Sequence, residues 1–296
     1  REYLKLFKKL KFDETYNIRV SKNYSHQINN RLKKIKDITH LLTFDSSLVS
    51  FLKTDIPIIL WTDILYTDYY KYYFRDQKIS KSTVSDIKIL ESETIKKCKL
   101  IIFTSKWSLN NAKQKYKKFQ NKFKLLEFGP SLHHQLSEKR IKQQILKREK
   151  NKIKLISLSV DSERKGIDKQ IEVMHYIKKK GFKCELTVIG HNSKKYYNDS
   201  NLKFLGFINK NTKNGERKIS LNLLNNHFHL LFSKAEAFGL ALIEANSRGL
   251  PNIAFNVGGI SHIVKNEING KLFKKNEKIK KIGNYIISTF RNKKKY

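Results

Sequence analysis

Two carboxylates, Glu236 and Glu244, lie eight positions apart on either side of a glycine in the stretch SKAEAFGLALIEA. Gly239 has no side chain, so the backbone there can approach a ligand closely. The apolar run from Leu240 predicts a helix, whose first turn offers unpaired N–H groups and about half a positive charge to an anion. The two carboxylates can accept hydrogen bonds from hydroxyl groups. The stretch therefore predicts a site for a ligand that is both anionic and hydroxylated, although acidic residues near a helix start are also favoured without a ligand.

Two further loops have the chemistry of anion sites. Arg164 and Lys165 follow the apolar segment 153–159, and two adjacent cations there can neutralise a diphosphate, with arginine adding forked hydrogen bonds. A solvated basic loop is an equal alternative in so lysine-rich a chain. In NVGGI, the backbone N–H groups of Gly258 and Gly259 can form an anion-binding nest, or the pair can be an ordinary tight turn. Three such loops in one domain favour anion binding more than any one of them does.

The elements that must position these loops are short apolar segments alternating with helical patterns. The predicted strands are 38–45, 57–63, 99–105, 122–129, 153–159, 184–190, 203–207, 227–233 and 252–255, with 17–20 as a further candidate. The predicted helices are 66–74, 84–97, 108–116, 167–180, 218–224, 240–248 and 279–290. This alternation indicates an α/β chain with parallel sheets covered on both faces. Ligands in such sheets bind at the carboxyl ends of the strands, where the three loops fall.

A charged, glycine-free segment divides the alternation into two. We expect an N-terminal Rossmann-like domain over 1–134, a linker over 135–151 for which a helix is the alternative, and a second Rossmann-like domain over 152–278. The last segment, 279–296, is expected to form a helix that packs back on the N-terminal domain. The predicted architecture is thus two parallel-sheet domains facing a cleft.

The charge balance is extreme, with 62 Lys and Arg against 26 Asp and Glu, a net charge of +36. Phosphate neutralisation by such charge suggests nucleic acid. However, residues 1–150 hold 33 basic and 15 acidic residues and the remainder 29 and 11, so no binding face is concentrated in either half. We interpret the excess as compositional bias and solubility, with attraction to an anionic membrane surface as an added role and no specific nucleic-acid partner.

Other features of the sequence indicate the cellular compartment and whether a metal site is expected. Cys98 and Cys184 lie far apart, which fits a reducing compartment better than a disulfide scaffold. No apolar run approaches the roughly 20 residues that span a bilayer, and no secretory signal is visible. The histidine pairs 133–134 and 227–229 have no carboxylate or cysteine at ligand spacing, so no metal site is expected. We therefore expect a cytoplasmic protein, with a peripheral contact at the inner membrane face.

The joint pattern resembles glycosyltransferase family 4, the retaining group 1 glycosyl transferases of GT-B fold. The similar pieces are ERKG, LTVIG, KFLGF, EAFGLALIEA, RGLPNIAFNVGGI and NEINGKLF over 153–273, and more weakly PIILWTD, ETIKKCKLIIFTSKWS and LLEFGPS over 38–130. The resemblance implies transfer of a sugar, with retention, from a UDP- or GDP-type nucleotide sugar, without metal or cofactor. It implies that the N-terminal domain takes a saccharide or lipid-linked acceptor, in polysaccharide or glycolipid synthesis.

The resemblance also implies roles for individual residues. Arg164 and Lys165 would hold the donor diphosphate, Glu236 would contact the sugar, and Glu244 would bind the ribose. Together with Asp63, the first three form the catalytic set that it implies. The remaining residues implied to contact the donor are Phe238, Gly239, Leu240, Gly258, Gly259, Gly206 and Phe207. Fixed cations and oriented N–H groups would stabilise the charge that develops on the leaving nucleoside diphosphate.

Two departures from the family pattern leave alternatives open. Many relatives carry a histidine where this chain has Asp63, which can polarise a sugar hydroxyl, assist the acceptor, or simply cap the following helix. All 12 glycines lie at position 129 or later, so the N-terminal domain is expected to be incomplete or to have a diverged glycine loop. An inactive, glycosyltransferase-like binding protein is the alternative function, and a basic nucleic-acid-binding protein a less favoured one. The tyrosines of 66–73 can form core and surface or stack on an acceptor sugar.

Overall fold

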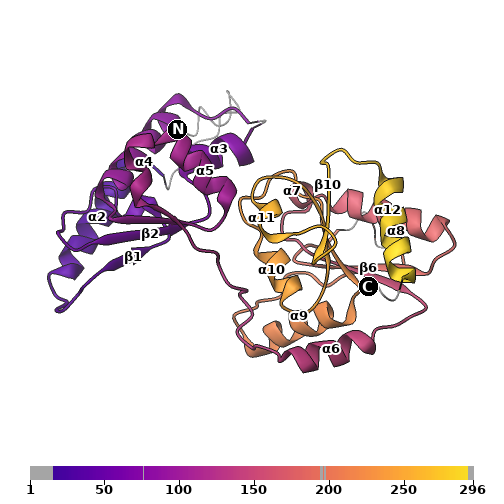
Figure 1. The fold of residues 1–296 in the computed structure, drawn as a ribbon. Coiled ribbons are helices and arrows are strands. Elements are labelled where there is room, and N and C mark those ends of the chain that lie inside the picture. The colour runs from indigo at the N-terminus through magenta and orange to yellow at the C-terminus, as the bar shows by residue number, and fades with distance from the viewer. Residues whose placement is uncertain (1–15, 76, 194–195, 197, 293–296) are drawn as a thin grey trace. The chain divides into compact units, whose positions relative to one another are not determined.

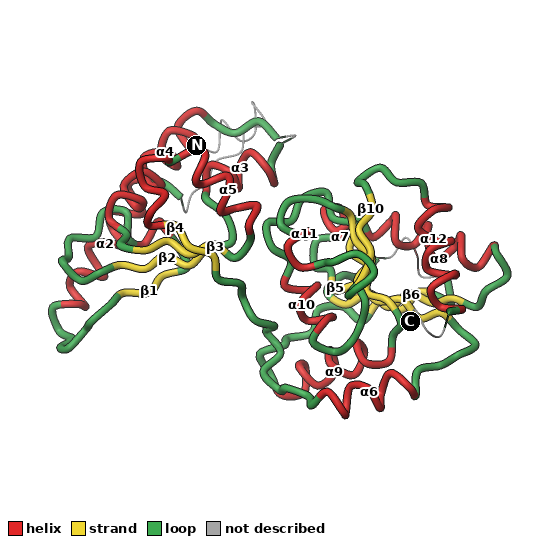
Figure 2. Tube along the Cα trace, viewed as in Figure 1, coloured by secondary structure: helices red, strands yellow, loops and turns green. Residues whose placement is uncertain are grey.

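The computed structural model describes residues 16–75, 77–193, 196 and 198–292, and the chain divides into two compact units, Arg1–Glu127 and Phe128–Tyr296. Each unit is built on its own parallel sheet (Figures 1 and 2). Among the described helices, none is both long and apolar enough to cross a bilayer.

The first unit contains a four-stranded sheet whose spatial order equals its chain order: β1 (Leu41–Thr43), β2 (Ile58–Thr62), β3 (Leu100–Phe103) and β4 (Phe123–Leu125). All pairs are parallel. The helices are α2 (Ile18–Leu32), η1 (Ser46–Leu48), α3 (Tyr66–Tyr73), α4 (Lys81–Lys97), α5 (Lys106–Lys115) and η2 (Lys117–Lys122). Right-handed crossovers between strands in sequential order place their helices on the same face. Figure 1 shows α2 to α5 on one side of this sheet.

Burial along the strands follows from this one-sided cover. In β2, Ile58 and Leu60 are buried while Ile59 and Trp61 are half-buried. The core of the unit gathers Leu60, Phe103 and the inner faces of α4 and α5. The opposite face of the sheet includes Leu42, which is 57% exposed, and no helix among the described residues covers it. The prediction of helices on both faces is therefore wrong for this sheet as described.

The second unit has six parallel strands in the order β10-β9-β8-β5-β6-β7. Their bounds are β5 (Ile153–Leu158), β6 (Cys184–Ile189), β7 (Leu202–Phe204), β8 (Phe228–Leu231), β9 (Asn252–Phe255) and β10 (Gly270–Phe273). Helices α8 (Ile167–Lys179) and α12 (Ile279–Arg291) pack with one face of the sheet. Helices α9 (Lys213–Asn225) and α10 (Leu240–Asn246) pack with the other, so this sheet is covered on both faces.

The strand order of the second unit reverses direction beside β5. From β5 the chain proceeds to β6 and β7 on one side, and then returns to β8, β9 and β10 on the other. Such a reversal is a topological switch point, where the loops that leave two adjacent strands turn to opposite faces and open a crevice. The loops after β5 and β8 are the two that meet here.

Some elements differ from expectation. The candidate strand 17–20 is wrong, because Asn17 caps α2 and its side chain accepts a hydrogen bond from Val20 N. In the segment 135–151, interpreted as a linker with a helix as the alternative, the helix is the one observed, as α6 (Glu138–Leu146). Short elements that the sequence did not predict are α7 (Ser162–Lys165), α11 (Ile260–Ile263) and β10. The remaining predicted strands and helices are confirmed, with ends that shift by a few residues.

Candidate active site

The loop after β5 is shaped by one capping interaction. Asp161 caps the one-turn helix α7 by accepting a hydrogen bond from Arg164 N at 3.0 Å. The same carboxylate takes a second bond from Arg164 Nε at 3.2 Å, so it orients the guanidinium as well as the backbone. Gly166 then ends α7 in the left-handed region, with φ of 68°, and begins α8. The turn sets Arg164 and Lys165 at the carboxyl end of the sheet.

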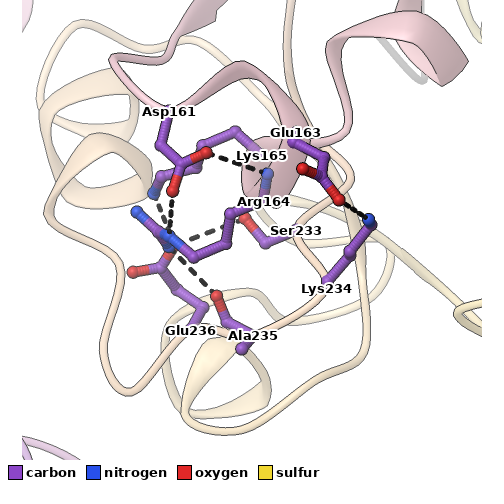
Figure 3. A network of polar contacts seen from close by, with 8 residues as sticks. All are labelled: Asp161, Glu163, Arg164, Lys165, Ser233, Lys234, Ala235 and Glu236. Atoms are coloured by element: carbon purple, nitrogen blue, oxygen red, sulfur yellow. Dashed lines mark hydrogen bonds and ion pairs between the residues drawn. The ribbon is translucent and has the colours of Figure 1, made fainter. Parts of the chain in front are cut away.

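Glu236 joins this loop to the one after β8. Its Oε2 accepts hydrogen bonds from Lys165 Nζ at 2.5 Å, Arg164 Nη1 at 3.3 Å and Ser233 Oγ at 3.3 Å. Arg164 Nη1 also donates to Ala235 O at 3.1 Å. Figure 3 shows both cations directed at the Glu236 loop. The side chains of Lys165 and Glu236 are only 12% and 11% exposed, so their attraction is screened less than at an open surface.

The third loop is tied to the same residue through the backbone. Gly259 N donates to Glu236 O at 2.9 Å. Gly258 takes φ of 52°, a left-handed conformation that suits glycine, whereas Gly259 is right-handed with φ of −81°. Of the two glycines, only Gly258 therefore needs the conformational freedom of glycine. The N–H of Gly259 is already used inside the protein, so the predicted anion nest has one donor fewer.

The glycine before α10 shapes the approach to the loop. Gly239 is the N-cap of α10 with φ of 108°, and a Cβ there would lie 2.8 Å from Leu242 Cδ1 and 3.5 Å from Glu236 Cγ. Phe238 is buried in the core beside this turn, and Leu240 is 37% exposed. Phe238 therefore contributes its backbone and its packing rather than an accessible ring.

Glu244 lies further along α10 and has a partner that the sequence did not reveal. Its Oε1 accepts from Lys210 Nζ at 2.8 Å, and its side chain is only 5% exposed. Lys210 comes from the loop after β7 and also donates to Ser131 Oγ at 3.1 Å. Gly206, at the start of that loop, has φ of 62°, and Phe207 beside it is 75% exposed. The loop after β7 thus contacts helix α10 at Glu244.

Asp63 lies in the first unit, after β2, whereas the other predicted site residues belong to the second unit. Its carbonyl accepts a hydrogen bond from Ser108 Oγ. The N-cap position of α3 is Leu65, whose side chain makes no cap hydrogen bond. A buried carboxylate from α4, Glu91, instead accepts from Thr67 N at 2.8 Å in the first turn of α3.

The tyrosines of α3 and the histidines of β8 and the residue before it make contacts within their own units. Tyr70 is buried, and Tyr72 lies with its ring 4.7 Å from that of Trp107. His229 is fully buried, and its Nδ1 lies 2.7 Å from Asn252 Oδ1. Burial lowers the pKa of His229 to about 4, and burial likewise lowers the pKa of His227 to about 4. Within the described part of the chain, no group of three His, Cys, Asp or Glu side chains is placed to hold a metal ion.

Arg164 and Lys165 both donate to one carboxylate oxygen of Glu236 at the switch point of the second sheet. Paired cations beside a carboxylate, at the carboxyl ends of a parallel sheet, fit the class of glycosyltransferases that use a nucleotide sugar. Residues 138–296 match the family model for glycosyl transferases group 1. Because the match spans more than half of the chain, the protein belongs to this family, glycosyltransferase family 4, whose donors are nucleotide sugars.

Solved structures agree on the fold. The Anabaena protein Alr3699/HepE, in complex with UDP and glucose, is 16% identical, with 92% of this chain and 72% of that one covered at a TM-score of 0.66. WaaG, a glycosyltransferase involved in lipopolysaccharide biosynthesis, is 16% identical, with 97% and 77% covered at 0.65. The sucrose-phosphate synthase of Thermosynechococcus elongatus is 15% identical, with 94% and 70% covered at 0.71. These likenesses show the GT-B fold. No curated protein matches the chain by sequence.

Proposed function

We propose that this protein is a retaining, metal-independent glycosyltransferase that moves a sugar from a UDP-sugar to a saccharide or lipid-linked acceptor. The observation that supports it most directly is the Glu236 carboxylate held between Arg164 and Lys165 at the switch point of the second sheet. UDP is favoured over GDP because HepE, which shares the fold, was solved with UDP and with UDP-glucose.

The chemistry follows from the cluster. Breaking the bond between sugar and diphosphate leaves negative charge on the diphosphate, and Arg164 and Lys165 stabilise it where it develops. Arg164 is oriented beforehand by Asp161, so little reorganisation is needed at the moment of reaction. When the cations turn to phosphate, Glu236 is released to accept hydrogen bonds from the sugar. The departing diphosphate, held on the donor face, draws the acceptor proton, and the new bond forms on that face with retention.

The remaining donor contacts are assigned in the same way. Glu244 binds the ribose diol, and the backbone at Gly239 and Leu240 faces sugar and phosphate. Gly258 lets the third loop pass close to the phosphate side. Gly206 and Phe207 lie in the loop that brings Lys210 to Glu244, and we place the exposed Phe207 ring against the base. Asp63 is assigned to the acceptor side, because it follows β2 in the first unit.

The proposal is tested by calorimetry with UDP and by turnover of UDP-glucose. Replacing Arg164 and Lys165 together by glutamine should weaken UDP binding by at least 100-fold, because two charge-assisted phosphate contacts of about 1.5–3 kcal/mol each are lost. Glu236→Ala should abolish transfer. Lys234→Ala is the matched control: it lies in the same loop, but it pairs with the exposed Glu163 outside the cluster and should change neither quantity. Unchanged UDP affinity in the double variant would refute the assignment.

The same measurements separate an enzyme from an inactive binding protein. An enzyme releases UDP only when an acceptor or water accepts the sugar, and the anomeric configuration of the product, read by NMR, reports retention. Lipopolysaccharide-type oligosaccharides are the first acceptors to try, since WaaG acts in lipopolysaccharide biosynthesis. We propose a cytoplasmic location with a peripheral contact to anionic membrane, because a net charge of +36 attracts such a surface. Donor binding without turnover across the acceptor panel would support the binding-protein alternative.

A further inference from the structure

A cavity in the Phe128–Tyr296 unit has no role in the proposed donor chemistry. It has a volume of about 710 Å³ and lies where the segment before α6, helix α6 and helix α9 meet. Its lining is His133, His134, Leu136, Arg140, Gln144, Asn211, Lys213, Glu216, Arg217, Ser220, Leu221 and Leu224. The volume is within the range of small-molecule sites, about 300–1,000 Å³. None of the residues assigned to the donor belongs to this lining.

The lining is strongly cationic. Arg140, Lys213 and Arg217 have no ion pair with any carboxylate that the structure describes. The carboxylate in the lining, Glu216, accepts the backbone N–H of His134 at 2.6 Å. Three side-chain cations therefore face one acid that is already hydrogen-bonded. An anion in the cavity would relieve the repulsion between them.

Arginine is more frequent around this cavity than the lysine-rich composition of the chain would predict. Arginine supplies 10 of the 62 basic residues, yet two arginines line the cavity and two more, Arg148 and Arg248, are buried behind it. Arg248 is 2% exposed and donates only to neutral groups, including Ser220 Oγ at 2.7 Å and His134 O at 2.8 Å. A buried guanidinium without a carboxylate in contact adds a fixed positive potential to the wall.

The floor of the cavity is apolar. Leu224 is buried at 6% exposure, Leu221 is 47% exposed, and Leu136 is half-buried. A purely inorganic anion would leave this surface in water, whereas a ligand with an apolar group would cover it. Forked guanidinium groups match phosphate oxygens in geometry as well as charge.

We propose that this cavity is a binding site for a small phosphate monoester that carries an apolar group. Its phosphate lies between Arg140, Lys213 and Arg217, and its apolar group lies on the leucines. The site is separate from the donor site and does not depend on the function proposed above.

Phenyl phosphate is the probe, titrated into the full chain by calorimetry at 0.15 M salt, where non-specific attraction to lysines is screened. We expect saturable binding with a stoichiometry of one. Arg217→Gln and Arg140→Gln should each weaken it at least 10-fold, and both side chains are exposed, so the fold should survive, as circular dichroism will show. Arg31→Gln, an exposed arginine of α2, is the matched control and should leave the affinity unchanged.

Two further variants test where the ligand binds. Leu221→Asn should weaken phenyl phosphate but not inorganic phosphate, because only the former reaches the apolar floor. Replacing Arg164 and Lys165 by glutamine should leave phenyl phosphate binding intact. The proposal is overturned if phenyl phosphate does not bind, if the Arg217 and Arg31 variants behave alike, or if the change at Arg164 and Lys165 abolishes binding, which would place the probe in the donor site.

Discussion

One oxygen atom, Oε2 of Glu236, accepts hydrogen bonds from a lysine, an arginine and a serine. These three partners determine which hydrogen bonds a bound ligand can replace. In the proposed mechanism, a diphosphate competes with Glu236 for Arg164 and Lys165, but it does not compete for Ser233. The carboxylate therefore keeps one fixed partner when the cations leave. The backbone bond from Gly259 N to Glu236 O also remains, so the position of the residue is preserved while its charge becomes available.

The proposed contacts to the diphosphate and to the ribose can be tested separately, at the level of single residues. Glu244→Gln should weaken UDP about 10-fold, because one charge-assisted hydrogen bond to the ribose becomes neutral, and should leave inorganic pyrophosphate unaffected. Arg164→Gln should weaken both ligands. Calorimetry with UDP and pyrophosphate measures the two effects on the same preparations. A Glu244 variant that loses pyrophosphate binding equally would show that the residue acts through the fold rather than through the ribose.

At the scale of elements, the junction between α7 and α8 depends on one glycine. Gly166 has φ of 68°, and a Cβ would lie 2.4 Å from the carbonyl oxygen of Phe232, which follows β8. Gly166→Ala combines left-handed strain, about 1–2 kcal/mol, with a backbone clash worth a further 1–3 kcal/mol. We expect this total loss in the free energy of unfolding, measured by urea titration with circular dichroism.

Gly181 provides the matched control for the clash. It also has positive φ, 85°, but a Cβ there would meet nothing within 4 Å. Gly181→Ala should therefore show the strain alone. Because the clash at Gly166 pushes on the loop that leads to Glu236, that variant should also bind UDP more weakly, while the Gly181 variant should not. Equal losses of stability in both variants would show that the clash with Phe232 does not contribute.

The sequence predicted elements best where local pattern and burial agree. The run CELTVIG predicts a strand over 184–190, and β6 spans Cys184–Ile189 with every residue buried. The local pattern around Asn17–Val20 is compatible with a strand or a helix. The side chain of Asn17 caps a helix, and the segment forms the start of α2. The charged segment 138–146 has few apolar residues, but Ile141 and Ile145 lie against Gly249, so packing makes it a helix of the second unit.

Only the part of the site that follows from the positions of strand ends could be predicted from the sequence. Arg164, Lys165 and Glu236 follow apolar runs, and strands in a parallel sheet present their ends at one edge, so their meeting could be anticipated. The pairing of Lys210 with Glu244 could not, because a lysine among 62 basic residues has no distinguishing signal. The use of the Gly259 N–H by Glu236 O depends on loop conformation, which composition does not determine.

At the scale of the whole molecule, the two units have separate cores and different optical probes. The core of the first unit contains Leu60 and Phe103, and that of the second Leu155 and Phe228. Both tryptophans of the chain, at positions 61 and 107, belong to the first unit. Tryptophan fluorescence therefore follows the unfolding of one unit, while circular dichroism follows both.

The units also differ in how acid acts on them. In the second unit, burial lowers the pKa of His227 and of His229 to about 4, below the usual 6.5. As pH falls from 6.5 toward 4, the unfolded chain therefore binds protons that the folded unit does not, and stability is lost. In the first unit, burial raises the pKa of Asp68, so that carboxyl contributes stability at low pH and loses it as pH rises.

Moving from pH 7 to pH 5 should accordingly destabilise the second unit selectively, by about 2 kcal/mol for each of the two histidines. In urea titrations, the transition followed by circular dichroism should split into two components. The component that tryptophan fluorescence does not report, which is the unfolding of the second unit, should shift to a lower urea concentration. His229→Gln should remove about half of that shift, because its amide side chain does not titrate and can still hydrogen-bond Asn252. A fluorescence transition that shifts as far as the other component, or a shift unchanged in the His229 variant, would assign the acid sensitivity to groups elsewhere in the chain.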